Sequence, residues 1–429
     1  MEPAGTVLED HAVVVHGGRI RAVLPGSELP HWKVREIVER PSHALIPGLV
    51  NAHTHAALTL LRHAAGGLPL DDWLRRRVWP LEARLVDERF VEDGTALAIA
   101  EMLLGGITCF ADMYYHPDVA ARVAARSGMR ACIGLPVLEQ PSNWAQDLDE
   151  YLDRGLRLRD AYRDDPRVGT LFVLHSPTST GDATLGRVRT LADQLQAPVM
   201  THLLESPTDR SREERRHGRG PVERLAAAGL VSDLLIAVHC VQLNMTEIAQ
   251  LAEAGASVVH CPGSNLKLAS GIAPLDELRR AGVGVALGTD GAASNDALDL
   301  LGEARLAALL AAGVTGNAAV LSPHEALHLA TLAGAQALGL GEVTGSIVPG
   351  KWADLASLRL DGPMVQPLHD VAGAIVHSAG RSAVCDTWVA GQRLVADGRL
   401  EQMDPRELAG RAARWRPRVV AALHAIAGQ

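Results

Sequence analysis

The sequence predicts an α/β fold: a (β/α)8 TIM-type barrel with a small β-sandwich domain built from both termini. Eight strand-like runs alternate with helix-like segments through the middle of the 429-residue chain, which is the pattern of a parallel barrel. Short β segments also lie near both ends. We therefore expect a composite small domain from residues 1–45 and 346–429, with a C-terminal helix, and a barrel from residues 46–345.

The small domain is predicted from three β segments. Residues 8–24 alternate apolar and polar side chains around Gly17-Gly18, as a hairpin does. Residues 345–360 and 382–398 show the same alternation, and the second segment has a turn at Ala390-Gly391.

The barrel is predicted from runs of apolar residues with helical segments between most of them. The expected strands are 44–55, 106–114, 130–138, 168–177, 198–205, 234–241, 256–265 and 284–291, and the expected helices include 87–104, 184–196, 220–229, 245–255 and 274–282. A doubly wound sheet would give a similar strand count. The barrel is favoured because reactive side chains follow several strands, at the end where barrel enzymes carry their sites.

Composition excludes several classes of function. The net charge is −9 with scattered signs, which predicts binding to neither nucleic acid nor an anionic membrane. There is no apolar run of 18 residues, and the first eleven residues do not form a signal peptide. The five cysteines are dispersed, so we expect neither a disulfide framework nor a zinc knuckle. We predict a cytoplasmic protein, and expect the charge runs at 75–77 and 211–219 to be solvated faces.

The first candidate ligands end the run 44–55, which reads ALIPGLVNAHTH. Side chains of a strand alternate between its faces, so His53 and His55 point the same way. Neutral imidazole is a ligand that zinc and iron accept. By itself such a pair is a weak signal, and two surface or hydrogen-bonded histidines are the more common explanation.

Later strands end in further candidates. His202 is followed by Glu205, His239 ends the next strand, and Asp290 ends the eighth. A mononuclear catalytic metal needs three or four protein ligands and an open position. The set that supplies them is His53, His55, His202 and Asp290. Glu205 and His239 then remain as acid–base groups beside the metal.

The lysines favour one metal over two. The chain has only Lys33, Lys267 and Lys351. None lies in the third or fourth strand of the predicted barrel, where a carbamylated lysine could bridge a second ion.

The sequence resembles the amidohydrolase superfamily, and within it the 5-methylthioadenosine/S-adenosylhomocysteine deaminase family. The resemblance covers nearly the whole chain. The stretches that carry it are PGLVNAHTHAALTLLRHAAGGLPLDDWLRRRVWPLEA (47–83), HLLES (202–206), HCPGSNLKLASGIAPL (260–275) and GVGVALGTDGAASNDALDLLGEARLAALL (282–310).

The resemblance implies roles for individual residues. The four ligands named above match the metal ligands of the family. Glu82 and His175 match positions that contact the nucleoside, Glu205 the residue that handles the base ring, and His239 the histidine beside the attacking water. Segment 68–82 should form a lid that brings Glu82 to the ribose. Without the family, Glu82 could be a solvated helix carboxylate and His175 a capping or core residue.

The chain also departs from the family. Thr178 stands where members often have an aromatic residue, and a pair of arginines used by some members has no match. Because of these two differences, the resemblance does not determine the 5′-substituent of the substrate. Members usually begin some residues earlier with another strand, so we expect the N-terminus to be either truncated or misassigned, which affects the edge of the small domain.

The predicted function is hydrolytic deamination at C6 of adenosine-type nucleosides: 5′-methylthioadenosine, S-adenosylhomocysteine or adenosine. We expect one divalent metal per chain, Zn²⁺ before Fe²⁺, a small-molecule nucleoside as the only other ligand, and a homo-oligomer. One alternative is a deaminase or chlorohydrolase of a free base or triazine, a substrate without ribose hydroxyls for Glu82 to bind. The other is a non-catalytic scaffold, which would not need to keep the metal-ligand residues.

Overall fold

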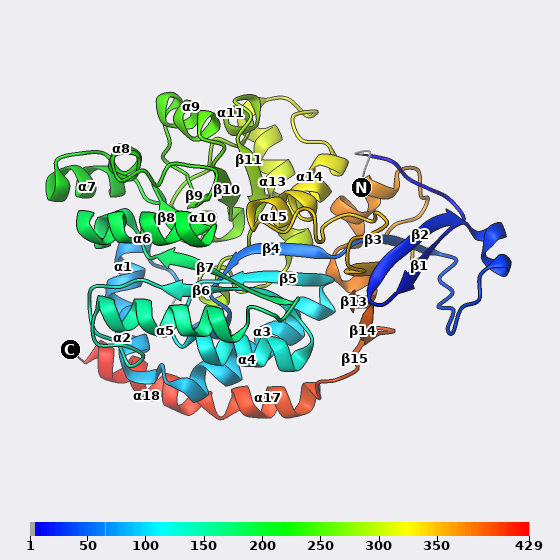
Figure 1. The fold of residues 1–429 in the computed structure, drawn as a ribbon, viewed down its shortest axis with the longest axis horizontal. Helices are drawn as coiled ribbons and strands as arrows, with labels where there is room; N and C mark the ends of the chain where they lie inside the picture. Colours follow the sequence, from blue (N-terminus) through cyan, green and yellow to red (C-terminus); the bar gives the residue numbers. More distant parts are fainter. Residues whose placement is uncertain (1–4, 65, 429) are drawn as a thin grey trace.

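The computed structural model describes residues 5–64 and 66–428, and its centre is a sheet of eight parallel strands curled into a barrel (Figure 1). The strands run in chain order around the barrel: β4 (Leu49–Thr54), β5 (Ile107–Asp112), β6 (Arg130–Pro136), β7 (Val168–Leu174), β8 (Val199–Leu203), β9 (Leu235–His239), β10 (Ser257–His260) and β11 (Gly284–Leu287). All eight predicted strands are confirmed. The expected strand 256–265 ends early, because helix α10 (Pro262–Lys267) begins within it. The first four residues of the expected small domain lie outside the described residues.

Side chains close the seam between the first and last strands. Asn51 Nδ2 donates to Thr289 Oγ1 at 2.8 Å, and Thr289 N donates to Asn51 Oδ1 at 2.9 Å. Just beyond, Asp290 N donates to the carbonyl of His53 at 3.0 Å. The seam therefore places the end of β4 directly beside Asp290.

Helices cover the outside of the barrel. The predicted helices are confirmed as α3 (Glu88–Leu104), α6 (Asp182–Leu195), α8 (Pro221–Ala227), α9 (Met245–Glu253) and α11 (Leu275–Arg280), and others are α4 (Pro117–Ser127), α5 (Leu148–Ala161), α13 (Leu300–Thr315), α14 (Pro323–Leu329) and α15 (Leu332–Ala337). The side chain of Asp87 caps α3 by accepting from Phe90 N at 2.7 Å. Ala335 and Ala337 of α15 share a buried cluster with Val50 and Ala286 of the barrel strands.

The small domain consists of two antiparallel sheets. The first sheet is the hairpin of β1 (His11–His16) and β2 (Arg19–Pro25). The second sheet has five strands in the order β15 (Arg399–Leu400), β14 (Gln392–Ala396), β13 (Val384–Val389), β12 (Leu355–Arg359) and β3 (His43–Pro47). Ile20, Leu355 and Trp388 pack between them. The expected β structure at 345–354 is wrong, since turns and one bridge occupy it.

One glycine explains why the predicted strand 44–55 is two strands. β3 belongs to the small domain and β4 to the barrel, and Gly48 joins them. A Cβ atom at Gly48 would lie 2.1 Å from Thr108 Oγ1. Only glycine therefore lets the chain pass from one sheet to the other at this point.

The C-terminal helices leave the small domain and pack on the barrel. In Figure 1, α17 (Pro405–Ala413) and α18 (Trp415–Ala427) run beneath α3 and α2 (Trp79–Leu85). Asp93 on α3 accepts from Arg411 Nε at 2.6 Å and from Trp415 Nε1 at 2.9 Å. Among the described helices, none is long and apolar enough to cross a membrane.

Short helices surround the carboxyl ends of the barrel strands. They are η2 (Ala56–Leu61), α1 (Leu70–Trp73), η3 (Leu74–Val78), η4 (Pro177–Ser179), α7 (Asp209–His217) and α12 (Ala292–Asn295). Helices α1, η3 and α2 follow one another without a break and are called the lid below (residues 70–85). One turn of the lid, η3, is a π-helix, a feature found most often at functional sites.

Candidate metal centre and its pocket

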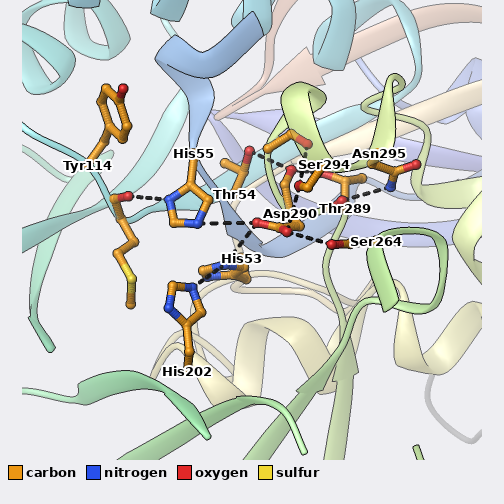
Figure 2. A network of polar contacts seen from close by, with 12 residues as sticks. His53, Thr54, His55, Tyr114, His202, Ser264, Thr289, Asp290, Ser294 and Asn295 are labelled. Carbon is orange, nitrogen blue, oxygen red and sulfur yellow. Dashed lines mark hydrogen bonds and ion pairs between the residues drawn. The ribbon is translucent and has the colours of Figure 1, made fainter. Parts of the chain in front are cut away.

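Three histidines from two strands face one another at the barrel mouth (Figure 2). Each of His53, His55 and His202 offers one ligand nitrogen, and these atoms lie within 4.8 Å of one another. Nε2 of His53 and Nε2 of His202 are 3.3 Å apart. The alternation of β4 brings its two histidines to the same face, as the sequence predicts.

The opposite nitrogens of two of these rings are held by backbone carbonyls. Nδ1 of His55 donates to the carbonyl of Met113, and Nδ1 of His202 donates to the carbonyl of His175 at 2.8 Å. Nδ1 of His53 lies 3.3 Å from the sulfur of Met200. A proton on Nδ1 leaves a lone pair on Nε2, which is how metal-binding histidines are usually oriented.

Asp290 supplies a carboxylate to the same point. Its Oδ2 accepts from Ser264 Oγ at 2.7 Å and from Ser294 Oγ at 2.6 Å. Its Oδ1 is buried without a hydrogen-bond donor and lies 3.2 Å from Nε2 of His55 and 3.4 Å from Nε2 of His53. Asp290 has a left-handed backbone (φ 61°), which is uncommon outside glycine and frequent at functional sites.

These four groups fit a divalent cation. Burial lowers the pKa of His53 to about 4, which favours the neutral ring that binds metal. At His55, burial is outweighed by the carboxylate of Asp290, which raises the pKa to about 9. Burial opposes ionisation of Asp290, but the adjoining rings of His53 and His55 hold its pKa well below the usual range. A buried carboxylate oxygen without a donor, close to the imidazole nitrogens of His53 and His55, is a donor set that suits zinc or iron.

His239 and Glu205 stand beside this set. His239 Nδ1 donates to Asn265 Oδ1 at 2.9 Å, and its Nε2 lies 3.6 Å from Glu205 Oε2. Burial, with the charges of Asp290 and Asp209, raises the pKa of Glu205 well above its usual range. This shift favours the protonated form of the buried Glu205 carboxyl group.

A pocket extends from the metal ligands to the lid. Its walls include Leu70, Trp73, Leu74, Val78, Trp79, Tyr114, Leu138, Val173, His175, Thr178, Glu205, Asp209, Arg212 and His239. Glu82 of the lid also lines it and accepts from the hydroxyl of Tyr114 at 2.9 Å. Burial raises the pKa of Glu82 to about 7, although this hydrogen bond opposes the shift. Burial lowers the pKa of His175 to about 4.

The structure thus brings every predicted site residue to one mouth, and adds others that sequence reasoning missed. Ser264, Asn265 and Ser294 lie within the PGSN and GTDGAASN stretches, so their motifs offered a signal. Tyr114 ends a predicted strand, and this position is a weaker signal. Asp209 accepts from the backbone N–H of Glu205 at 2.9 Å, and nothing in the sequence marks it.

Known proteins resemble this chain over nearly its whole length. The model of the amidohydrolase family matches residues 44–394. A 5-methylthioadenosine/S-adenosylhomocysteine deaminase of Teredinibacter turnerae is 43% identical, over 97% of this chain and 95% of its own.

Two solved structures have the same fold and are described with bound zinc. An adenosine deaminase from Xanthomonas campestris is 47% identical, with a TM-score of 0.96 over 98% of this chain and 96% of its own. An atrazine chlorohydrolase from Arthrobacter aurescens is 26% identical, with a TM-score of 0.87 over 95% of both chains.

Proposed function

The chain belongs to the amidohydrolase family, and on that premise we propose that it hydrolyses the 6-amino group of adenosine-type nucleosides. The products are the inosine analogue and ammonia. Relatives named 5-methylthioadenosine/S-adenosylhomocysteine deaminases, 36–43% identical, support this substrate class. The candidates are 5′-methylthioadenosine, S-adenosylhomocysteine and adenosine.

We assign one divalent metal to His53, His55, His202 and Asp290. Zinc is our first choice because similar structures are described with it, and Fe²⁺ is the alternative. Bound there, the ion would supply a water whose pKa is lowered from about 16 towards 7.

The protein's own groups then move two protons. Asp290, whose pKa is held low, accepts the proton of the attacking water. His239 orients that water through Nε2, since Nδ1 is committed to Asn265. Glu205 donates its proton to a nitrogen of the purine ring as C6 is attacked. Asp290 then gives the proton that it took from water to the amino group, which leaves as ammonia, and Glu205 recovers a proton from the new hydroxyl at C6. A positioned acid or base of this kind contributes about 10²–10⁴-fold in rate.

The ribose belongs at the lid end of the pocket. The carboxylate of Glu82 is fixed by the hydroxyl of Tyr114 at 2.9 Å and can accept from ribose hydroxyls. The ring of His175, which is neutral because its pKa is lowered, lines the same pocket. A free purine or a triazine has no hydroxyls for Glu82, which is why we place nucleosides first.

One observation supports this reaction above all: Glu205 is a buried acid, 3.6 Å from His239 and beside a metal-type ligand set. A binding scaffold has no need of an acid that is costly to bury. We also expect a cytoplasmic homo-oligomer, which stays a prediction.

The test is a release assay for ammonia with the metal-loaded enzyme. Adenosine, 5′-methylthioadenosine and S-adenosylhomocysteine are compared with guanine and with aminotriazines. Turnover of guanine or triazines with none of the nucleosides would refute the proposal.

The Glu205→Gln variant tests the assigned role of the acid. We expect it to keep its metal and lose kcat by about 10² or more, because the transferable proton is removed. His202→Ala should lose metal and activity together, and Glu214→Gln, an exposed change on α7, should alter neither.

A further inference from the structure

The lid is tied to the barrel next to Glu205. The carboxylate of Asp71, on lid helix α1, accepts from Thr208 Oγ1 at 2.7 Å and from the guanidinium of Arg212 on α7. Asp71 and Arg212 both line the pocket, as Glu205 does. The contact therefore joins the lid to the loop that carries Glu205.

The same loop fixes the backbone of Glu205. Asp209 Oδ2 accepts from the N–H of Glu205 and of Ser206, each at 2.9 Å. Leu204, just before them, has a left-handed backbone (φ 48°), which a branched side chain disfavours. The orientation of Glu205 thus depends on hydrogen bonds to Asp209.

Arg212 contacts both the lid and the carboxylate of Asp209. Its Nη2 reaches Asp71 and also donates to Thr208 Oγ1 at 3.0 Å, and its Nη1 lies 3.7 Å from Asp209 Oδ1. One guanidinium therefore spans from the lid to the carboxylate that orients Glu205.

Helix α7 gives Arg212 a fixed base. Glu213, the next residue, is fully buried and accepts from Arg224 Nη1 at 2.8 Å. On the other side, Arg210 donates to both carboxylate oxygens of Glu247, at 2.7 and 2.8 Å. These bonds hold α7 to α8 and α9, which keeps Arg212 in place beside the lid.

We propose that Arg212 is a positioning residue that couples closure of the lid to the placement of Glu205. Substrate under the lid keeps Asp71 on Arg212, and Arg212 in turn keeps Asp209 and the Glu205 loop in their working arrangement. This inference rests on the proposed function for the role of Glu205. The side chains of Asp71 and Arg212 are about one-third exposed (32% and 31%), so their pairing adds little to overall stability and its effect should be on geometry.

A double-mutant cycle of Asp71→Asn and Arg212→Gln in the metal-loaded enzyme tests the coupling. Each change should lower kcat by about tenfold with a smaller change in KM, since misplacing a reacting group is costly. The double variant should be no worse than either single one, and Arg212→Lys should recover part of the loss. Asp72→Asn is the matched control, because its partner Arg76 lies on the lid itself, 3.1 Å away; it should keep normal kcat.

Hydrogen exchange gives a second readout that needs no activity. In Arg212→Gln, amides of residues 70–79 and of residues 204–209 should both exchange faster, with metal content unchanged, while Asp72→Asn leaves residues 204–209 as in the wild type. Additive losses in the cycle, faster exchange in only one of the two segments, or loss of metal would each overturn the proposal. If the wild type deaminates no nucleoside, the proposed function is wrong, and the exchange result alone still decides whether the lid and the loop are coupled.

Discussion

The barrel buries a charged cluster at each end of its strands, and the two differ in whether their hydrogen bonds are complete. At the amino ends, Arg130 of β6 meets Asp354 of the small domain. At the carboxyl ends, Asp290 meets the three histidines. Both carboxylates are shielded from water, so solvent exposure does not distinguish them.

The amino-end cluster satisfies all of its atoms. Asp354 accepts from Arg130 Nε at 2.6 Å and Nη2 at 3.2 Å, from Thr344 Oγ1 at 2.7 Å, and from Ala390 N at 2.6 Å. Arg130 Nη1 donates to the carbonyl of Pro166 at 2.6 Å. A buried charge pair with full hydrogen bonding holds the two domains together and needs nothing else.

The mouth cluster leaves one carboxylate oxygen without a donor and places imidazole nitrogens close to it. Such an arrangement is costly on its own and favourable around a cation. The comparison therefore separates a cluster that stabilises the fold from one that binds a ligand, and it makes opposite predictions for the two carboxylates.

The largest expected effect is that of Asp290→Asn on catalysis. The change removes a metal ligand and the acceptor of the water's proton, so kcat should fall by about 10³ or more. In chelated protein, the free energy of unfolding should shift by about 1 kcal/mol or less, since an amide can still accept from Ser264 and Ser294. Steady-state kinetics and denaturant unfolding measure the two. A destabilisation as large as the one expected for Asp354→Ala would contradict the proposed difference between the two clusters.

Asp354→Ala should have the opposite profile. It leaves Arg130 buried and unpaired, which costs about 3–5 kcal/mol of unfolding free energy. The molecules that remain folded should hold their metal and keep near-normal kcat. Replacing both partners, Arg130→Met with Asp354→Leu, should destabilise less than the single change, and calorimetry of the three variants checks this order.

The smallest expected effect is on the pH profile of the pocket. The pKa of Glu82 is raised to about 7, and its carboxylate form is the one that accepts ribose hydroxyls, so kcat/KM should fall as the pH drops through 7. The hydroxyl of Tyr114 lowers this pKa, so Tyr114→Phe should move the acid limb to higher pH, by about one unit. Tyr162→Phe, a change on the outside of the barrel, should leave the profile in place. A shift to lower pH would show that Glu82 is not the titrating group.

Most of the fold could be predicted from the sequence because periodicity reports burial directly. The eight strands of the barrel and the turn at Ala390-Gly391 follow from alternation and turn residues. The break at Gly48 could not be predicted, since it depends on Thr108 in a neighbouring strand. The boundaries of the domains stay a prediction.

The site was predictable where a residue acts by its own chemistry. His53, His55, His202 and Asp290 follow strands, and their side chains can bind metal wherever strands converge. A residue that acts by holding another residue in place has no sequence pattern that sets it apart.

The charge run at 211–219 shows this limit. Its composition predicts a solvated face, but Glu213 is fully buried and Arg212 reaches the lid. That interpretation holds for most of the run, which is exposed. It fails at Glu213 and Arg212, because their partners, Arg224 and Asp71, are brought close only by the fold.

The most direct test of the account is the metal content of the purified chain, measured together with its thermal unfolding before and after chelation. The account predicts one divalent ion per chain, and a lower Tm once it is removed, since a ligand at about 1,000 times its Kd stabilises the folded state by about 4 kcal/mol. His202→Ala should carry no ion and show no change on chelation. Two tightly bound ions per chain, or full deaminase activity in protein that contains none, would contradict it.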